Sequence, residues 1–349
     1  MKIALVGFQG SGKTSVFNAL TGQHAETGMG KKGANLGRIQ VPDPRVDALS
    51  KIYQPKKTTY AEIQFVDVAG PADTGHRSQG GLDQNLVGHI READALVHVV
   101  RGFDNPQLTG APDAARDVAA FEDELILTDL IQIEGRVSRL KKQARTKELD
   151  LMEKLQAELE AGRPLRAVAL HEEEKQQVSG FRFLSQKPML ALVNQAEEAI
   201  KAPLPEAIKK AAADRGLEVI ALSAPIEAEI MAMEPADQAA FLADLGLSEP
   251  VRARFIQAAY RLLDLISFLT SGEDEVRAWT IRRGTVARVA AGKIHSDIER
   301  GFIRAEVTPF ADFVVAGSEA KCRETGKTRL EGKEYLVLDG DIVHFRHSS

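Results

Sequence analysis

The chain has 349 residues with a hydrophobic content of 44%, more than one ordinary core holds, which predicts two or three domains and excludes a chain that is disordered throughout. A formal net charge of −5 and a pI near 6.0 argue against a protein that coats nucleic acid by bulk charge. Cys322 is the only cysteine, which excludes an internal disulfide and a metal cluster built from thiolates.

The first residues enter a strand almost at once. This leaves no room for the charged leader, apolar core and cleavage site of a secretory signal. No apolar run approaches the roughly 20 residues that a membrane span needs. The sequence therefore predicts a cytoplasmic protein.

An apolar strand at residues 2–6 is followed by a glycine-rich loop, Gly7-Phe-Gln-Gly-Ser-Gly-Lys-Thr14, and by the start of a helix. The loop has the spacing of a P-loop, whose small residues let the main chain wrap phosphates while N–H groups point at the anion. Lys13 is expected to reach the terminal phosphates, and Thr14 to supply a hydroxyl to Mg²⁺. The nucleotide-binding residues predicted here are Gln9, Gly10, Ser11, Gly12, Lys13, Thr14 and Ser15.

Up to about residue 110, short apolar strands alternate with polar loops and helices. This order predicts an α/β fold, a P-loop NTPase domain whose mostly parallel sheet binds ligands at its strand ends. Two strands far downstream continue the pattern, which indicates that another segment is inserted between the two parts. The predicted strands are residues 3–6, 63–66, 95–100, 189–193 and 218–222.

Asp67-Val-Ala-Gly70 ends the strand at residues 63–66, which places Asp67 at the carboxyl edge of the sheet beside the P-loop. There it is expected to hold Mg²⁺ through water, while the Gly70 N–H contacts a γ-phosphate. Lys13 and Gly70 are the predicted catalytic residues. Pro71 stands where Ras-like enzymes place the glutamine that orients the attacking water, so the water-positioning residue stays unknown and hydrolysis is expected to be slow.

Between about residues 122 and 160, apolar residues recur at alternating four- and three-residue steps. That period is typical of a coiled-coil seam, and a second, shorter stripe predicts two helices that fold back as a hairpin. Its basic side chains leave two readings open, a solvated face or an arm that contacts RNA or a partner. The seam residues are Ile126, Leu130, Ile133, Val137, Leu140 and Ala144, followed by Leu155 and Leu159. The basic residues are Arg136, Arg139, Lys141, Lys142, Arg145 and Lys147.

From about residue 276 the pattern becomes that of a compact α+β module without a catalytic constellation. An alternating strand at residues 276–281 precedes a short helical stretch and a strand at residues 302–307. Asp339-Gly340 lies between two apolar runs and is a tight-turn signal.

Asn194-Gln-Ala-Glu197 follows the strand at residues 189–193, where GTPases commonly carry Asn-Lys-x-Asp to read guanine. Glutamate for aspartate and glutamine for lysine change that readout, so guanine specificity stays open. Ser223-Ala-Pro-Ile-Glu227 follows the last strand, where a base-contacting Ser-Ala loop would lie. The residues predicted at the base are Asn194, Gln195, Glu197, Ser223, Ala224 and Pro225.

Longer strings resemble the YchF or Obg-like ATPase family across nearly the whole chain. The resemblance implies a G domain at residues 1–120 and 186–270, a helical hairpin at 121–185, and a TGS domain of β-grasp type at 271–349. It also implies that ATP is preferred over GTP and that the protein associates with ribosomes. The strings include Val41-Pro-Asp-Pro-Arg-Val-Asp-Ala-Leu49, Phe65-Val-Asp-Val-Ala-Gly70, His98-Val-Val-Arg101, Glu275-Val-Arg-Ala-Trp-Thr-Ile281, Glu299-Arg-Gly-Phe-Ile-Arg304 and Leu338-Asp-Gly-Asp341.

The chain also departs from the pattern of this family. Gln9 and Gly10 stand where its P-loop has Pro-Asn, and that asparagine is a candidate potassium ligand, so dependence on potassium stays open. Lys31 replaces the switch threonine, which removes a second hydroxyl for Mg²⁺, and Gly110 stands where the family has a histidine. His98 is expected to be a packed structural histidine rather than a base.

Three functions follow from these observations. The first is a regulatory NTPase that binds ATP with Mg²⁺, hydrolyses it slowly and presents the state of its switch loops to a ribosome or another ribonucleoprotein. The second is a nucleotide-dependent binding module with negligible turnover. The third is a translation-factor-like GTPase with a variant base motif.

Overall fold

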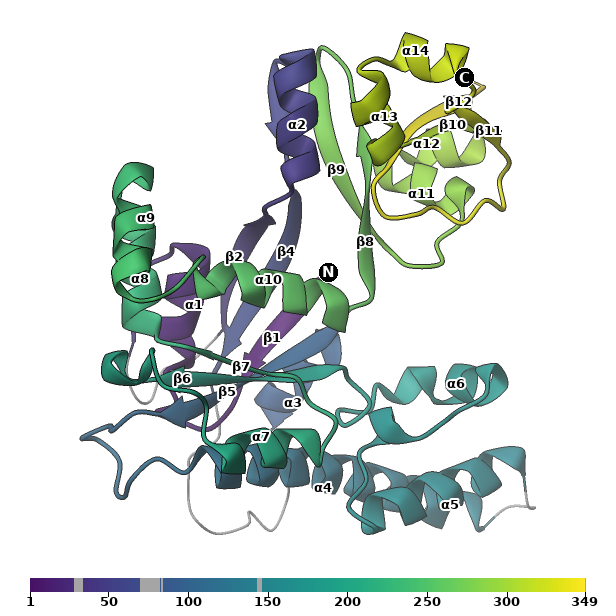
Figure 1. Cartoon of the computed structure of the whole chain (residues 1–349). Helices are drawn as coiled ribbons and strands as arrows, with labels where there is room; N and C mark the ends of the chain where they lie inside the picture. The colour runs from purple at the N-terminus through teal and green to yellow at the C-terminus, as the bar shows by residue number, and fades with distance from the viewer. Residues whose placement is uncertain (28–33, 70–81, 83, 143–145, 349) are drawn as a thin grey trace. The chain divides into compact units, whose positions relative to one another are not determined.

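The computed structural model describes residues 1–27, 34–69, 82, 84–142 and 146–348 (Figure 1). The chain forms two compact units, and each is assembled from two separated stretches of sequence. Unit 1 consists of Met1–Ile39 and Gln64–Phe255, and unit 2 of Gln40–Ile63 and Ile256–Ser349. The boundaries expected from sequence place residues 40–63 with the nucleotide-binding part, whereas the structure groups them with the C-terminal residues.

Unit 1 is built on a six-stranded sheet of order β2-β4-β1-β5-β6-β7. The pairs β1–β4, β1–β5, β5–β6 and β6–β7 are all parallel, so these strands end at the same edge of the sheet. The five predicted strands are confirmed, and β2 is a sixth that the sequence did not reveal. The strands are β1 (Lys2–Val6), β2 (Ala34–Val41), β4 (Ala61–Val68), β5 (Ala95–Gly102), β6 (Met189–Gln195) and β7 (Val219–Leu222).

Helices pack on the sheet of unit 1 because its central strands are apolar on both sides, as parallel strands in such folds are. One face packs against α3, α4 and α7, whose buried residues share a core with β1, β5 and β6. No helix within the described ranges is both long and apolar enough to cross a membrane. The helices are α1 (Lys13–Thr21), α3 (Gln84–Glu92), α4 (Ala114–Leu140), α5 (Lys147–Glu160), α6 (Glu172–Val178), α7 (Glu206–Ala213), α8 (Ala224–Ala232), α9 (Pro235–Asp244) and α10 (Val251–Leu262), the last of which ends in unit 2.

The helices α4 and α5 confirm the predicted pair, with a core of their own along the apolar seam. α4 is longer than the seam suggested, because it begins at Ala114, where the Asp113 side chain accepts a hydrogen bond from the Arg116 N–H. α5 begins after Thr146, which caps the Leu149 N–H in the same way. Ala144 and Arg145 lie outside the described residues.

A buried carboxylate ties α4 to the segment that returns from the hairpin. Asp129 is fully buried and accepts hydrogen bonds from the Leu184 N–H at 2.8 Å and from both the N–H and the hydroxyl of Ser185 at 2.7 Å. Burial raises the pKa of Asp129 to about 6 although these donors oppose the shift. The carboxylate therefore fixes where the chain re-enters the sheet just before β6.

We expect Asp129→Ala to lower the free energy of unfolding by about 2–4 kcal/mol, because it leaves buried donors without an acceptor. Chemical denaturation followed by circular dichroism measures this loss. The matched control is Asp123→Ala, on an exposed position of the same helix, for which we expect a change within about 0.5 kcal/mol. Equal effects of the two substitutions would contradict the assignment.

Unit 2 contains a second six-stranded sheet of order β11-β10-β12-β8-β9-β3. β8 pairs antiparallel with β9 and parallel with β12, while β10 pairs antiparallel with β12 and β11. α11 packs its buried alanines on one face of this sheet. The strands are β3 (Lys57–Thr59), β8 (Leu265–Thr270), β9 (Glu275–Arg282), β10 (Phe302–Pro309), β11 (Arg329–Glu331) and β12 (Asp341–His347). The helices are α2 (Pro44–Tyr53), α11 (Ala287–Ile294), α12 (Ser296–Arg300), α13 (Phe310–Ala316) and α14 (Glu319–Glu324).

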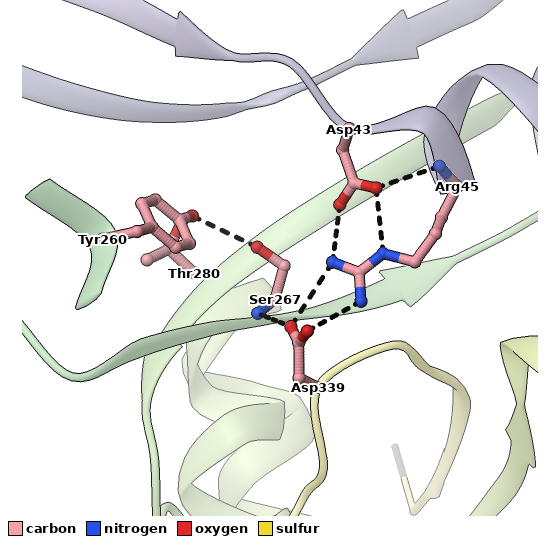
Figure 2. Close-up of polar contacts among 6 residues, drawn as sticks. All are labelled: Asp43, Arg45, Tyr260, Ser267, Thr280 and Asp339. Carbon is pink, nitrogen blue, oxygen red and sulfur yellow. Dashed lines mark hydrogen bonds and ion pairs between the residues drawn. The ribbon is translucent and has the colours of Figure 1, made fainter. Parts of the chain in front are cut away.

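Residues 40–63 complete unit 2 from a distant part of the sequence. β3 adds a parallel edge strand to β9, and α2 buries Val46 and Leu49 in a core shared with β8, β9 and α13. Figure 2 shows the guanidinium of Arg45 between two carboxylates, bonded to Asp43 at 2.7 Å and to Asp339 at 2.9 Å. The same Asp339 accepts the Ser267 N–H of β8, so one carboxylate joins three segments of unit 2.

The tight turn predicted at Asp339-Gly340 is present, but the apolar runs on either side of it do not pair with each other as a hairpin. Only the second run is a strand, β12, whereas the first makes a single bridge from Leu336 to Val286. Gly340 does adopt the left-handed conformation of a turn, with a φ of 84°. The contacts of Asp339 with β8 and Arg45 hold the chain in a loop rather than in a strand that pairs with β12.

Candidate functional site

The predicted P-loop connects β1 to α1 at the carboxyl edge of the unit 1 sheet. Gly7 and Gly12 are required there, because both have a positive φ and both lie against neighbouring atoms. A Cβ at Gly7 would lie 2.3 Å from the Val99 carbonyl oxygen, and one at Gly12 would lie 2.2 Å from Asn194 Nδ2. The loop is therefore packed against Val99 in the middle of β5 and against Asn194 near the end of β6.

Lys13, the first residue of α1, places its charge inside this loop. Its Nζ donates to the carbonyl oxygens of Gly7 at 2.9 Å and Phe8 at 2.8 Å, and the residue is only 7% exposed. Burial lowers the pKa of Lys13 to about 8, and the charge of Asp67 partly offsets this shift. A buried ammonium aimed into a loop of main-chain N–H groups is suited to bind the terminal phosphates of a nucleotide.

The two predicted metal ligands are in contact. The Thr14 hydroxyl donates to Asp67 Oδ2 at 2.8 Å, and Asp67, near the end of β4, is 3% exposed. A hydroxyl beside a carboxylate is the hard oxygen donor set that Mg²⁺ prefers, so the residues present fit this ion. Asn35 of β2 donates to the same carboxylate oxygen at 3.0 Å. Sequence reasoning missed Asn35, although it lies only four positions after Lys31, which was compared with the switch threonine of the family.

Asn194 joins the base motif to the P-loop. At the end of β6, its Nδ2 donates to the Ser11 carbonyl and its Oδ1 accepts the Ala224 N–H, both at 3.2 Å. One buried amide thus joins the predicted phosphate loop to the two segments that the sequence placed at the base, the end of β6 and the start of α8. The motif sits where a base reader is expected, at the ends of the strands.

The remaining predicted residues surround this junction. Gln195 is buried at the end of β6, whereas Glu197 is exposed in the turn that follows. Ser223 and Ala224 are buried, and Pro225 is exposed in the first turn of α8. In the P-loop, Gln9, Gly10 and Ser15 are half-buried. Gly70, Pro71 and Lys31 lie outside the described residues.

The loop after β5 also touches the P-loop, which sequence reasoning did not predict. Asn105 Nδ2 donates to the Gly10 carbonyl at 3.2 Å, and a Cβ at Gly10 would lie 2.6 Å from Leu108 Cδ1. The string Phe103-Asp-Asn105 was visible in the sequence but carried no expected role. Gly110, where a histidine was expected in the family, is exposed in the same loop.

The sheet order, the loop after β1 and the lysine at the start of α1 define a P-loop NTPase. The family model described as "50S ribosome-binding GTPase" matches residues 2–133, and a C-terminal YchF-GTPase model described as "Protein of unknown function (DUF933)" matches residues 265–348. The chain belongs to the YchF family. Its relatives extend over the full length of the sequence.

Curated relatives named "Ribosome-binding ATPase YchF" include that of Bacillus subtilis, which is 38% identical over 98% of this chain and 98% of its own length. The protein of that name from Haemophilus ducreyi is 39% identical over 99% of this chain and 98% of its own length. A solved structure titled as the Schizosaccharomyces pombe YchF GTPase superimposes with a TM-score of 0.86 at 30% identity, covering 99% of this chain and 97% of that one.

The pKa of Lys13 gives a testable pH dependence. In the free protein its ammonium loses the proton at about pH 8, whereas bound phosphates favour the charged form. We therefore expect ATP affinity to fall as pH rises above about 8, approaching tenfold per pH unit. Calorimetric titration from about pH 7 to 9.5 measures this slope. Lys13→Arg is the control, because arginine stays charged throughout and its affinity should show no such fall. A flat wild-type profile would contradict the expected shift.

Proposed function

We propose that this protein is a ribosome-associated ATPase that acts as a regulatory switch in the cytoplasm. It binds ATP with Mg²⁺ at the P-loop, hydrolyses it slowly and alters its binding to the ribosome with the nucleotide state. The observation that carries this proposal is the match at 38–39% identity, over nearly the full length, to proteins named ribosome-binding ATPases. The P-loop geometry of unit 1 provides the site that such an activity needs.

Phosphate binding is assigned to Lys13 and to the N–H groups of Gly10, Ser11 and Gly12. The buried ammonium supplies positive charge where water is excluded and charge interactions are strong. Thr14 and Asp67 would hold Mg²⁺, which when bound neutralises charge on the phosphates. Asn35, through its bond to Asp67, would orient that carboxylate.

Base recognition is assigned to the junction around Asn194. Its amide is fixed by the P-loop and by Ala224, which supports a structural part in shaping the base pocket. Glu197 lies exposed beyond the strand. Gln195 stands where the Asn-Lys-x-Asp motif has its lysine, and Glu197 where the motif has its aspartate. These differences from Asn-Lys-x-Asp support ATP in preference to GTP.

Slow turnover is supported by the identity of the residue after Gly70. Proline at position 71 has neither an N–H nor a polar side chain with which to orient water. A related protein is titled a GTPase, and one family model is described as a 50S ribosome-binding GTPase. A GTPase with a variant base motif is therefore the second candidate function.

The choice of base is tested by competition for one fluorescent nucleotide analogue in the presence of Mg²⁺. We expect unlabelled ATP to displace the analogue at lower concentration than GTP, and Lys13→Ala to abolish binding. Displacement by GTP alone would replace the ATPase assignment with the GTPase. Single-turnover hydrolysis under the same conditions separates an enzyme from a module that only binds.

Ribosome association is tested by sedimentation of the protein with purified 70S particles and 50S subunits. We expect more protein in the pellet with a non-hydrolysable ATP analogue than with ADP, because a γ-phosphate holds the switch loops of P-loop NTPases and ADP lacks it. Lys13→Ala should remove the difference between nucleotides. Equal pelleting in both states by the wild-type protein would argue against a nucleotide-controlled switch.

A further inference from the structure

His98 is a buried imidazole beneath the P-loop whose presence packing alone does not explain. It lies in β5 and is fully buried. Neither ring nitrogen has a hydrogen-bond partner among the described residues. Two buried polar atoms without partners cost free energy, about 1–3 kcal/mol for each group left unsatisfied. We therefore expect the His98 imidazole to form a hydrogen bond in another state of the protein.

The neighbours of His98 hold its ring in place. The ring stacks on Phe121 of α4 with the centroids 4.5 Å apart and an angle of 27° between the planes. Phe121 in turn meets the ring of Phe8, in the P-loop, edge to face at 5.8 Å. Burial lowers the pKa of His98 to about 3, with the charge of Lys13 adding to the effect, so the ring is neutral and carries one N–H.

The ring of His98 also lies against Gly7, whose carbonyl oxygen accepts a hydrogen bond from Lys13. A Cβ built on Gly7 would lie 3.2 Å from His98 Cδ2, the ring carbon bonded to Nε2. The Gly7 carbonyl and its neighbour at Phe8 both accept from Lys13 Nζ. The edge of the ring that includes Cδ2 thus lies next to Gly7, and the carbonyls of Gly7 and Phe8 both depend on the single ammonium group of Lys13.

When phosphates bind, the Lys13 ammonium has too few N–H bonds for all of its partners. A lysine ammonium has three N–H bonds, and Lys13 uses two of them on the carbonyls of Gly7 and Phe8. Contact with both the β- and γ-phosphates requires two N–H bonds, so Lys13 must release one carbonyl. A buried carbonyl without a donor would weaken nucleotide binding.

We propose that the neutral N–H of His98 takes over a P-loop carbonyl, that of Gly7 or Phe8, when Lys13 turns to the phosphates. His98 is then a positioning residue of the nucleotide site rather than a catalytic one. The inference rests on the proposed nucleotide binding at this loop. This role explains why position 98 has a histidine rather than a third phenylalanine beside Phe8 and Phe121.

His98→Phe separates this role from packing. Phenylalanine keeps the stack on Phe121 but has no donor, so the nucleotide-free protein should melt at the same or a higher temperature. Its Kd for ATP with Mg²⁺ should nevertheless rise about fivefold, the effect of one lost hydrogen bond. His98→Gln, which restores an N–H of similar reach, should bind within about twofold of wild type. If histidine only fills space, phenylalanine should bind ATP as tightly as wild type, which would overturn the proposal.

A second measurement needs no substitution. With histidine side chains labelled by ¹⁵N, we expect the His98 N–H signal to move to a hydrogen-bonded shift and resist exchange when a non-hydrolysable ATP analogue and Mg²⁺ are added. An unchanged His98 signal at saturation would overturn the proposal even if His98→Phe failed to fold. Wild-type protein that binds no nucleotide would remove both this inference and the proposed function, whereas tight wild-type binding with unaffected His98→Phe would remove only the inference.

Discussion

The charge of Lys13 is held almost out of water by two main-chain carbonyls, and the surroundings of the loop follow from that burial. An ammonium in such a place is costly unless it is hydrogen-bonded, so the main chain curls back to bring the two carbonyl oxygens to it. Curling brings the loop against β5 and the end of β6, where at Gly7 and Gly12 a Cβ would collide with neighbouring atoms. Asn194 then closes the other side by bonding to the Ser11 carbonyl. The same burial that makes the site costly in the free protein makes its charge effective toward phosphate.

Parts of this arrangement were predictable because their signals are local. The P-loop spacing and the apolar runs of β1, β4, β5 and β6 needed only the sequence between neighbouring positions. β2 was missed because it is half-exposed, with glycine in its middle, and β3 because three polar residues show no alternation. The contacts of Asn35 and Asn105 were also out of reach, since an asparagine in a loop reveals its partner only after the sheet has brought distant segments together.

Long-range contacts that sequence patterns do not reveal also shape the C-terminal part of the chain. An Asp-Gly pair between apolar runs favours a tight hairpin when only local preferences act. Here the turn does form, but the carboxylate of Asp339 is bonded to a main-chain N–H in β8 and to a guanidinium in α2, and the run before the turn does not pair with β12. Domain boundaries were obscured for the same reason. No feature of residues 40–63 indicates that their partners lie beyond residue 255.

Because unit 2 combines residues 40–63 with residues 256–349, its two parts are synthesised at different times. Arg45 and Asp339 are separated by 294 residues, so α2 leaves the ribosome long before the strands that cover it. At a synthesis rate of about 5–20 residues per second, Val46 and Leu49 wait roughly 15–60 seconds for Phe313 and Ile342 to join their shared core. During this interval α2 presents an apolar face, while the strands of the unit 1 sheet are all made before the C-terminal part of unit 2. Unit 2 can therefore close only near the end of translation, and an interrupted chain carries an uncovered helix that exposes it to chaperones and proteases.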